Sequence, residues 1–311
     1  MDFRQLKYML MVAEERSFSK AAQKLYIAQP SLSQYIQKLE QQLGVELFDR
    51  STSPLRLTYA GELYAETAKH ILDLNMQLSQ QMEDIVDFKK GRLVIGLSTF
   101  RSTYIMPMLL PSFYEKFPGI DVVLIEGTSP ELYDLAVKGV TDISIMTLPI
   151  NEDHFSYDPI MEEEILLALP PHHPACEKFK ANEIDMKTRH KIELSSLRDE
   201  PFILLKQNQK LHQISAYLCE QAGFRPKIIL ETESIEAAHA FAAAGMGITF
   251  IPDTIASFNR FLEHPMYFSL EEFKATRTLV VAYRKGKYIS KAAKEFINLA
   301  QTVLKPHNSI K

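Results

Sequence analysis

One helical period in residues 29–43 constrains the fold most strongly, because it separates apolar from polar side chains. Apolar residues recur every three or four positions, which predicts an α-helix with one buried face. They are Leu32, Ile36, Leu39 and Leu43. The opposite face is nearly free of carboxylates and holds Ser31, Ser33, Gln34, Gln37, Lys38 and Gln41. Such a face can approach phosphates without repulsion, and serine and glutamine can read base edges in the major groove.

Two shorter helices are predicted before this segment. Asp2 can cap a first helix, with Gln5 three residues on, and Ser17 can cap a second one. Pro30 suits the first turn of the third helix, where its missing N–H costs nothing, and Gly44 ends that helix.

A hairpin is predicted next, with short strands at residues 47–50 and 55–58. Arg50 and Arg56 lie on it and could form a wing against the DNA backbone or minor groove. The alternative for residues 1–58 is a small helical bundle with an ordinary solvated face.

A long helix is predicted from the cap Thr58 to about Lys90, since this stretch lacks proline and its one glycine, Gly61, lies in the first turn. Its apolar residues follow the 3.5-residue period of a coiled-coil seam. They are Tyr64, Ala68, Ile71, Leu74, Leu78, Met82 and Ile85. A helix roughly 45 Å long would leave this stripe in water. Pairing with a second copy is therefore predicted, the alternative being packing against the chain's own C-terminal domain.

A different pattern begins after Gly91. Apolar runs alternate with helical stripes such as Ile105, Leu109 and Phe113, which is typical of a doubly wound α/β sheet. The first strands are predicted at residues 93–97, 122–125 and 142–146. A second set is predicted at residues 165–169, 202–205, 227–230 and 248–251, and a strand at 279–283 is expected to return to the first set.

Ligands of open α/β sheets bind outside the carboxyl ends of the strands, where helix N-termini offer free N–H groups. Short hydroxyl side chains and cations at these positions suit a small polar or anionic ligand. The candidates are Ser98, Thr99, Arg101, Thr128, Ser129, Thr147, Lys206, Gln207, Thr232 and Ser234. The alternative is that the hydroxyls are helix caps and that Arg101 and Lys206 are solvated surface charges.

A specific string of residues runs through the first domain. It consists of Ser17-Phe18-Ser19-Lys20-Ala21-Ala22, Leu25, Gln29-Pro30-Ser31-Leu32-Ser33, Ile36, Leu39-Glu40, Leu43-Gly44, Leu47-Phe48, Arg50, Leu57-Thr58 and Ala60-Gly61. In these residues and their spacing the chain resembles the LysR-type transcriptional regulators, and the resemblance covers essentially its whole length.

The resemblance implies an α/β protein of three parts. Residues 1–58 would form a winged helix-turn-helix and residues 59–90 a dimerising linker helix. Residues 91–311 would form a two-lobed, periplasmic-binding-protein-like (type 2) effector domain. Lobe I would comprise about 91–161 and 266–311, and lobe II about 162–265.

The resemblance also assigns DNA contacts to the third helix and the wing. The matching positions are Gln29, Pro30, Ser31, Ser33, Gln34, Lys38, Arg50 and Arg56. The helical period independently places Ser33, Gln34 and Lys38 outward. One departure is Tyr35, which stands where an arginine or another polar residue is often found.

Composition adds few constraints. The net charge is −4, and residues 1–60 hold eight Lys/Arg against six Asp/Glu, so that the excess of acid lies in the rest of the chain. The sequence has neither a membrane-length apolar run nor the basic start of a secretory signal, so a cytoplasmic protein is expected. Cys176 and Cys219 are far apart and are interpreted as buried, inert thiols.

These observations predict a DNA-binding regulator switched by a small-molecule effector. Its expected partners are double-stranded promoter DNA, the effector, a second copy through the linker helix, a homotetramer and RNA polymerase. The alternative is a cytoplasmic small-molecule binding protein without DNA function. No nucleophile–base pair or metal set is visible, His172-His173 is interpreted as a loop, and no enzyme activity, catalytic residue, metal or cofactor is predicted.

Overall fold

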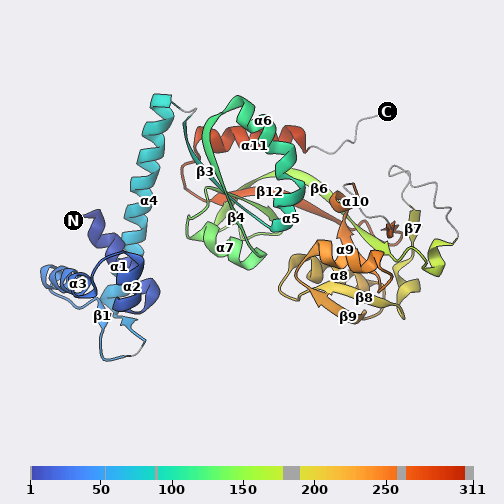
Figure 1. Ribbon diagram of the computed structural model, residues 1–311, viewed down its shortest axis with the longest axis horizontal. Helices are drawn as coiled ribbons and strands as arrows, with labels where there is room; N and C mark the ends of the chain where they lie inside the picture. Colours follow the sequence, from blue (N-terminus) through green and yellow to red (C-terminus); the bar gives the residue numbers. More distant parts are fainter. Residues whose placement is uncertain (1, 53, 88–89, 178–189, 258–263, 305–311) are drawn as a thin grey trace. The chain divides into compact units, whose positions relative to one another are not determined.

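The computed structural model describes residues 2–52, 54–87, 90–177, 190–257 and 264–304. The chain divides into two compact units, Met1–Ile85 and Val86–Lys311 (Figure 1). Within the described residues, no helix combines the length and the apolarity that a membrane span requires.

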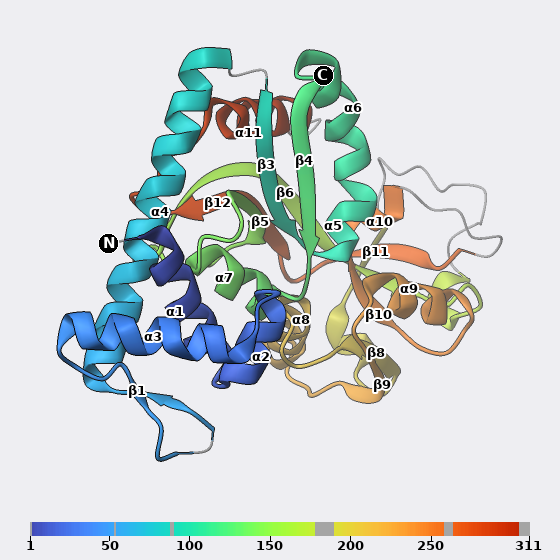
Figure 2. The same ribbon diagram turned by 60° about the vertical axis from the view of Figure 1, so that its left-hand side comes forward.

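The first unit is helical with one small hairpin (Figure 2). Its helices are α1 (Phe3–Glu15), α2 (Phe18–Lys24), α3 (Gln29–Leu43) and α4 (Tyr59–Asp87), and its paired strands are β1 (Phe48–Asp49) and β2 (Arg56–Leu57). The predicted caps are confirmed: Asp2 accepts from the Arg4 N–H at 3.0 Å and Ser17 from the Lys20 N–H at 3.4 Å. The hydrophobic core of this unit includes Met9, Val12, Leu32, Ile36 and Phe48.

Two glycines set the ends of α3 and α4. Gly44 ends α3 in the left-handed region, at φ +71°, where a residue without a Cβ is least strained. A Cβ at Gly61 would lie 2.0 Å from the Leu47 carbonyl oxygen, so only glycine lets the first turn of α4 approach the hairpin. Thr58 caps that turn by accepting from the Gly61 N–H at 3.0 Å, as predicted.

The second unit contains a mixed sheet of order β4-β3-β5-β12-β6-β11-β7, with β10 also paired to β6. We call the part around its first four strands the first lobe. Its strands are β3 (Lys90–Leu97), β4 (Gly119–Glu126), β5 (Ile143–Thr147) and β12 (Thr276–Arg284), and its helices are α5 (Thr99–Tyr104), α6 (Met106–Lys116), α7 (Ser129–Val137) and α11 (Lys291–Val303). β3 lies parallel to β4 and β5, whereas β12 is antiparallel to β5 and β6.

Strand β12 shows why both faces of this sheet are covered. Successive side chains of a strand point to opposite faces. Leu279 and Val281 pack into the core that α6 and α11 complete, whereas Val280 and Ala282 pack with Ala136 of α7. The predicted doubly wound architecture is therefore confirmed.

Strand β6 (Phe155–Leu169) runs through both lobes (Figure 1). Its first part pairs with β12 as far as Glu164, and β10 takes over as a partner at Ile165. The apolar run at residues 165–169 predicted only its end. The earlier part has no apolar pattern, because Pro159 and three consecutive glutamates interrupt it.

The second lobe packs around the end of β6. Its strands are β7 (His190–Ile192), β8 (Pro201–Leu205), β9 (Lys227–Thr232), β10 (Thr249–Pro252) and β11 (Met266–Leu270). Its helices are α8 (Lys210–Gln221), α9 (Ile235–Ala243) and α10 (Asp253–Ser257), with 3-10 turns at Pro174–Cys176 and Leu194–Leu197. β8 and β9 are parallel, and Phe202 bridges β8 to Ile248 beside β10. The short β7 and β11 carry no pattern that predicted them.

Candidate functional site

The outer face of α3 is the first candidate site. Its apolar residues Leu32, Ile36 and Leu39 are buried in the first unit, as predicted. Leu43 was expected on the same buried face but is 44% exposed, because it is the last residue of α3 before Gly44 ends the helix. The predicted contact residues Gln29, Pro30, Ser31, Gln34 and Lys38 are exposed, and Ser33 is half-buried. The separation of faces expected from the sequence is therefore present.

Glu40 explains why this outer face carries no negative charge. It is the one carboxylate of α3, and it is 8% exposed. Its Oε1 accepts from the N–H groups of Leu47 and Phe48 at 2.9 and 3.2 Å, and its Oε2 from Arg50 Nη2 at 2.6 Å. The guanidinium of Arg50 also lies 5.7 Å from the ring centre of Phe18. Glu40 thus ties the hairpin to α3 while turning its charge away from the outer face.

Three further residues of the first unit, Arg56, Tyr35 and Tyr26, lie in different environments. Arg56 is exposed on β2, opposite Asp49. Tyr35 turns toward α1, where its hydroxyl donates to Asp2 Oδ2 at 3.2 Å and its ring lies 5.1 Å from that of Tyr8. Tyr26 was not selected from the sequence, yet it is 95% exposed in a left-handed turn just before α3.

The second candidate site is a cavity of about 750 Å³ in the second unit, lined by residues of both lobes. Six predicted effector residues line it: Ser98, Thr99, Arg101, Thr128, Ser129 and Thr147. Ser234, at the start of α9, lines it as well. The expectation that ligands bind at the carboxyl ends of strands, called the strand-end rule below, therefore selected residues from four separate stretches of sequence that line one cavity.

Two of these residues, Ser98 and Thr128, stand at the N-cap positions of α5 and α7. Ser98 accepts from the Arg101 N–H at 3.4 Å. Thr128 donates through its N–H and its hydroxyl to Glu131, at 2.8 and 2.7 Å. Both residues lie in the cavity wall, and the two hydrogen bonds from Thr128 lower the pKa of the Glu131 carboxyl.

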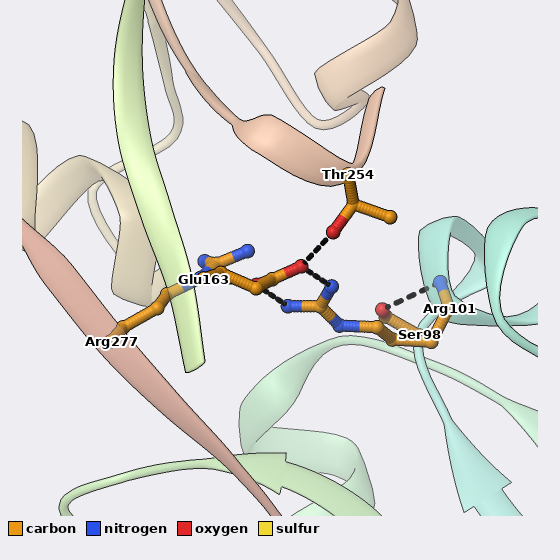
Figure 3. A network of polar contacts seen from close by, with 5 residues as sticks. All are labelled: Ser98, Arg101, Glu163, Thr254 and Arg277. Carbon is orange, nitrogen blue, oxygen red and sulfur yellow. Dashed lines mark hydrogen bonds and ion pairs between the residues drawn. The ribbon is translucent and has the colours of Figure 1, made fainter. Parts of the chain in front are cut away.

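Arg101 lies in this wall but is engaged within the protein (Figure 3). Its guanidinium donates to both oxygens of Glu163, at 2.5 and 2.6 Å. Arg277 Nε donates to the same carboxylate at 2.8 Å, and the Thr254 hydroxyl is a further donor. Glu163 is fully buried, and burial alone would raise its pKa. Arg101 and Arg277 outweigh that effect and lower the pKa to about 2.

Three predicted effector residues lie outside the cavity wall. Lys206 and Gln207 are exposed, and Lys206 Nζ pairs with Glu233 at 2.7 Å. Thr232 is half-buried, and its hydroxyl accepts from the Ser234 N–H at 3.3 Å.

A turn explains this displacement. Gln209 donates its N–H to the Lys206 carbonyl, so that α8 begins at Lys210 rather than directly after β8. The wall therefore contains Gln209 and Lys210, which the strand-end rule would have selected if the turn had been recognised. Arg277 also lines the cavity, and it carried no signal in the sequence because it lies within a strand.

Comparison with known proteins places both sites in a family. Residues 3–62 match the model for bacterial regulatory helix-turn-helix proteins of the lysR family, and residues 87–305 match the LysR substrate binding domain. The chain is 33% identical to the HTH-type transcriptional regulator YcgK of Bacillus subtilis, over 98% of this chain and 95% of that one.

Two solved structures resemble the chain over most of its length. One is a hydrogen peroxide-bound mutant of OxyR from Corynebacterium glutamicum, with TM-score 0.62 and 26% identity over 97% of this chain and 92% of that one. The other is CbnR in complex with its target DNA, with TM-score 0.63 and 24% identity over 97% of this chain and all of that one, a likeness of fold. The helix-turn-helix match favours a regulator over a binding protein without DNA function or an enzyme. The chain belongs to the LysR family of transcriptional regulators.

Proposed function

We propose that the outer face of α3 enters the DNA major groove and reads an operator, and that a small molecule in the 750 Å³ cavity switches this regulator. One observation carries the proposal: the exposed face of α3 offers Ser31, Gln34 and Lys38, while the carboxylate of Glu40 is buried behind it. Lysine neutralises phosphates, and glutamine can form paired hydrogen bonds with adenine.

The linker helix supports a homodimer. Of the predicted stripe, Leu74, Leu78 and Met82 are 63%, 55% and 47% exposed on α4, and the side chain of Ile85 lies outside the described residues. The earlier stripe residues are already covered within the chain: Ala68 is buried, and Tyr64 and Ile71 are half-buried. Contiguous exposed apolar side chains favour pairing with a second copy. A two-fold dimer would place two α3 helices on half-sites about one helical turn apart.

Larger assembly and partners follow from the same proposal. Two such dimers would form a homotetramer, and contact with RNA polymerase would convert binding into control of transcription. The place of action is the cytoplasm, where bacterial promoters are. Residues 1–58, 59–90 and 91–311 would act as DNA-binding, dimerising and effector-binding parts.

The effector would act by binding one arrangement of the second unit more tightly than another. Ser98, Thr99, Thr128, Ser129 and Thr147 would contact it, since all line the cavity and carry hydroxyls. Thr128 would do so as an acceptor, because its own N–H and hydroxyl donate to Glu131. Arg101 would act through its pair with Glu163, and Lys206, Gln207 and Thr232 would lie outside direct contact.

DNA selected from a random pool by the wild-type chain provides the test. Gln34→Ala should lose about 1–3 kcal/mol of discrimination at one base pair of each half-site, measured by fluorescence anisotropy on matched and mismatched duplexes. Gln42→Ala is the control, because the Gln42 side chain is exposed on the same helix but accepts from Gln5 of α1 at 3.3 Å. Unchanged discrimination in Gln34→Ala would contradict the proposal.

A further inference from the structure

The turn that joins α2 to α3 (Figure 2) has a backbone conformation that suits glycine, yet its residue is a tyrosine. The Tyr26 N–H donates to the Gln23 carbonyl at 3.2 Å. The next N–H, of Ile27, donates to the Ala22 carbonyl at 3.1 Å. This pair of hydrogen bonds is the Schellman motif, in which the residue after the helix end is left-handed and usually glycine. Tyr26 holds that place at φ +55°, so the turn explains its backbone but not its side chain.

The side chain of Tyr26 is not held by the rest of the protein. It is 95% exposed, and among the residues that the structure describes its hydroxyl has no hydrogen-bond partner and its ring contacts no other ring. Tyr35 differs, because Asp2 and the ring of Tyr8 hold it. A bulky residue in the left-handed region is strained, and glycine or asparagine is not. Tyr26 is therefore a strained residue whose side chain adds nothing to the fold.

Tyr26 lies directly before the segment proposed to enter the major groove. It is two residues from Ala28, the N-cap of α3, and three from Gln29, which is exposed together with Pro30 and Ser31. In helix-turn-helix proteins, residues at the N-terminus of the recognition helix contact the bases, while the first helix crosses the sugar–phosphate backbone. The turn between the two helices therefore lies at the rim of the groove, next to that backbone.

The charge around this turn suits a phosphate. Residues 17–39 contain three lysines and no aspartate or glutamate. The carboxylates that flank this stretch are both engaged, Glu15 with Lys24 and Glu40 with the hairpin. Tyrosine hydroxyls are among the groups that donate to phosphate oxygens in DNA complexes. A phosphate can therefore approach the Tyr26 hydroxyl without repulsion from this part of the chain.

We propose that Tyr26 is a further DNA-contacting residue: its hydroxyl donates to a phosphate oxygen at the rim of the major groove, and its ring packs on the adjacent deoxyribose. This inference rests on the proposed entry of α3 into that groove. Because the contact is made to the backbone, it fixes how α3 lies in the groove and does not read the bases. The helical period could not select Tyr26, since it belongs to a turn and not to a helix face.

Two substitutions in the full chain separate this role from a purely structural one. Tyr26→Asn suits a left-handed turn, so the first unit should be as stable as in the wild type or more stable in urea. Its operator affinity should still fall about tenfold for each half-site, and so about a hundredfold for a dimer, because the hydrogen bond and the ring contact are both lost. Tyr26→Phe keeps the ring and should lose about fivefold for each half-site. Affinity is measured by fluorescence anisotropy on the selected operator.

The pattern of the loss distinguishes Tyr26 from the base-reading and charged residues of α3. A neutral group that contacts the backbone should weaken binding of matched and mismatched duplexes by the same factor and leave the salt slope unchanged. Gln34→Ala should instead lower discrimination at one base pair. Tyr217→Phe is the matched control, because Tyr217 is also an exposed tyrosine but lies in α8 of the second unit. It should change operator affinity less than about twofold.

The remaining outcomes each decide the matter. Unchanged operator affinity in Tyr26→Phe would overturn the inference, and the result for Gln34→Ala would then judge the proposed function separately. Loss of base discrimination in Tyr26→Phe would overturn it as well, since the hydroxyl would then contact a base. If Tyr26→Asn failed to fold, Tyr26→Phe, which keeps the ring, would decide alone. Failure of the wild type to select any DNA would contradict both this inference and the proposed function.

Discussion

The two units each contain a buried glutamate that holds an arginine, but the two sites differ in how the charge is enclosed. In the first unit, Glu40 receives two backbone N–H groups and Arg50, whose side chain remains 39% exposed. In the second unit, Glu163 is fully buried between Arg101 and Arg277, with Thr254 as a further donor. All partners of Glu40 lie within ten residues of it, whereas those of Glu163 are 62 to 114 residues away.

This difference shows two uses of a buried carboxylate. Glu40 fixes a local hairpin and keeps negative charge off the outer face of α3. Glu163 joins α5, β12 and α10 to β6, so that elements of both lobes share one ion cluster beside the cavity. The enclosed cluster should therefore carry more stability, and the open one should matter more for DNA binding.

The largest effect is expected for Glu163→Gln, which leaves two buried guanidiniums without their counter-charge. The free energy of unfolding of the second unit should fall by about 3–5 kcal/mol, measured by urea denaturation. Glu162→Gln is the control, because this neighbouring side chain is exposed on the same strand. If Glu163→Gln and Glu162→Gln lowered the free energy of unfolding equally, the buried carboxylate would contribute no more stability than an exposed one, and the proposed distinction would be wrong.

Acid should abolish the difference in unfolding free energy between the wild type and Glu163→Gln. The pKa of Glu163 is about 2 in the folded chain and 4.5 in the unfolded one, so its contribution is complete above 4.5 and is lost as pH falls through 2. The gap in unfolding free energy between wild type and Glu163→Gln should stay constant above pH 4.5 and narrow below it. A gap that stays constant down to pH 2 would show that Glu163 is not held as a carboxylate.

A smaller loss is expected for Glu40→Gln. The amide can still accept from Leu47 or Phe48 but no longer pairs with the charge of Arg50, so the first unit should lose about 1.5–3 kcal/mol. DNA affinity should fall as well, because the hairpin is no longer fixed to α3. Glu46→Gln, exposed just before the hairpin, should leave stability and affinity unchanged. If Glu40→Gln bound DNA as tightly as the wild type, fixing the hairpin to α3 would not be needed for DNA binding.

The smallest effect concerns salt dependence. Lys38→Ala should reduce the slope of log affinity against log salt by about 1 for each recognition helix, and so by about 2 for a dimer on two half-sites, since one phosphate contact is lost per helix. Lys24→Ala is the matched control, because Lys24 of α2 pairs with Glu15. Equal slopes for the two variants would place Lys38 away from the backbone of the DNA.

The same two regions differ in how far sequence could predict them. The helices of the first unit, their caps and the outward side of α3 follow from a local period and from residues such as Asp2, Ser17 and Gly44. The cavity depends on long-range pairing. Strand ends identified Ser98 and Thr128, but the turn before α8 moved the site from Lys206 to Lys210. Nothing local connects Arg277 with Glu163, which meet only because β12 pairs with β6.

Arg101 shows the same limit in a single residue. Its position after the first strand of the second unit was identified correctly, and it does line the cavity. Its partner was not predictable, because Glu163 lies 62 residues further along the chain, in a strand without an apolar pattern.

Protection of the outer face of α3 by DNA is the most direct test of the central claim. Cys176 and Cys219 are buried, and burial raises the pKa of their thiols to about 11 and about 12, so both should react slowly with maleimide. Ser31→Cys places one exposed thiol on that face with little change of shape, and Ser196→Cys places one on an exposed serine of the second unit. Selected operator DNA should slow labelling of Ser31→Cys about tenfold or more and leave Ser196→Cys unaffected. Equal labelling of Ser31→Cys with and without bound DNA would show that this face does not lie against the duplex.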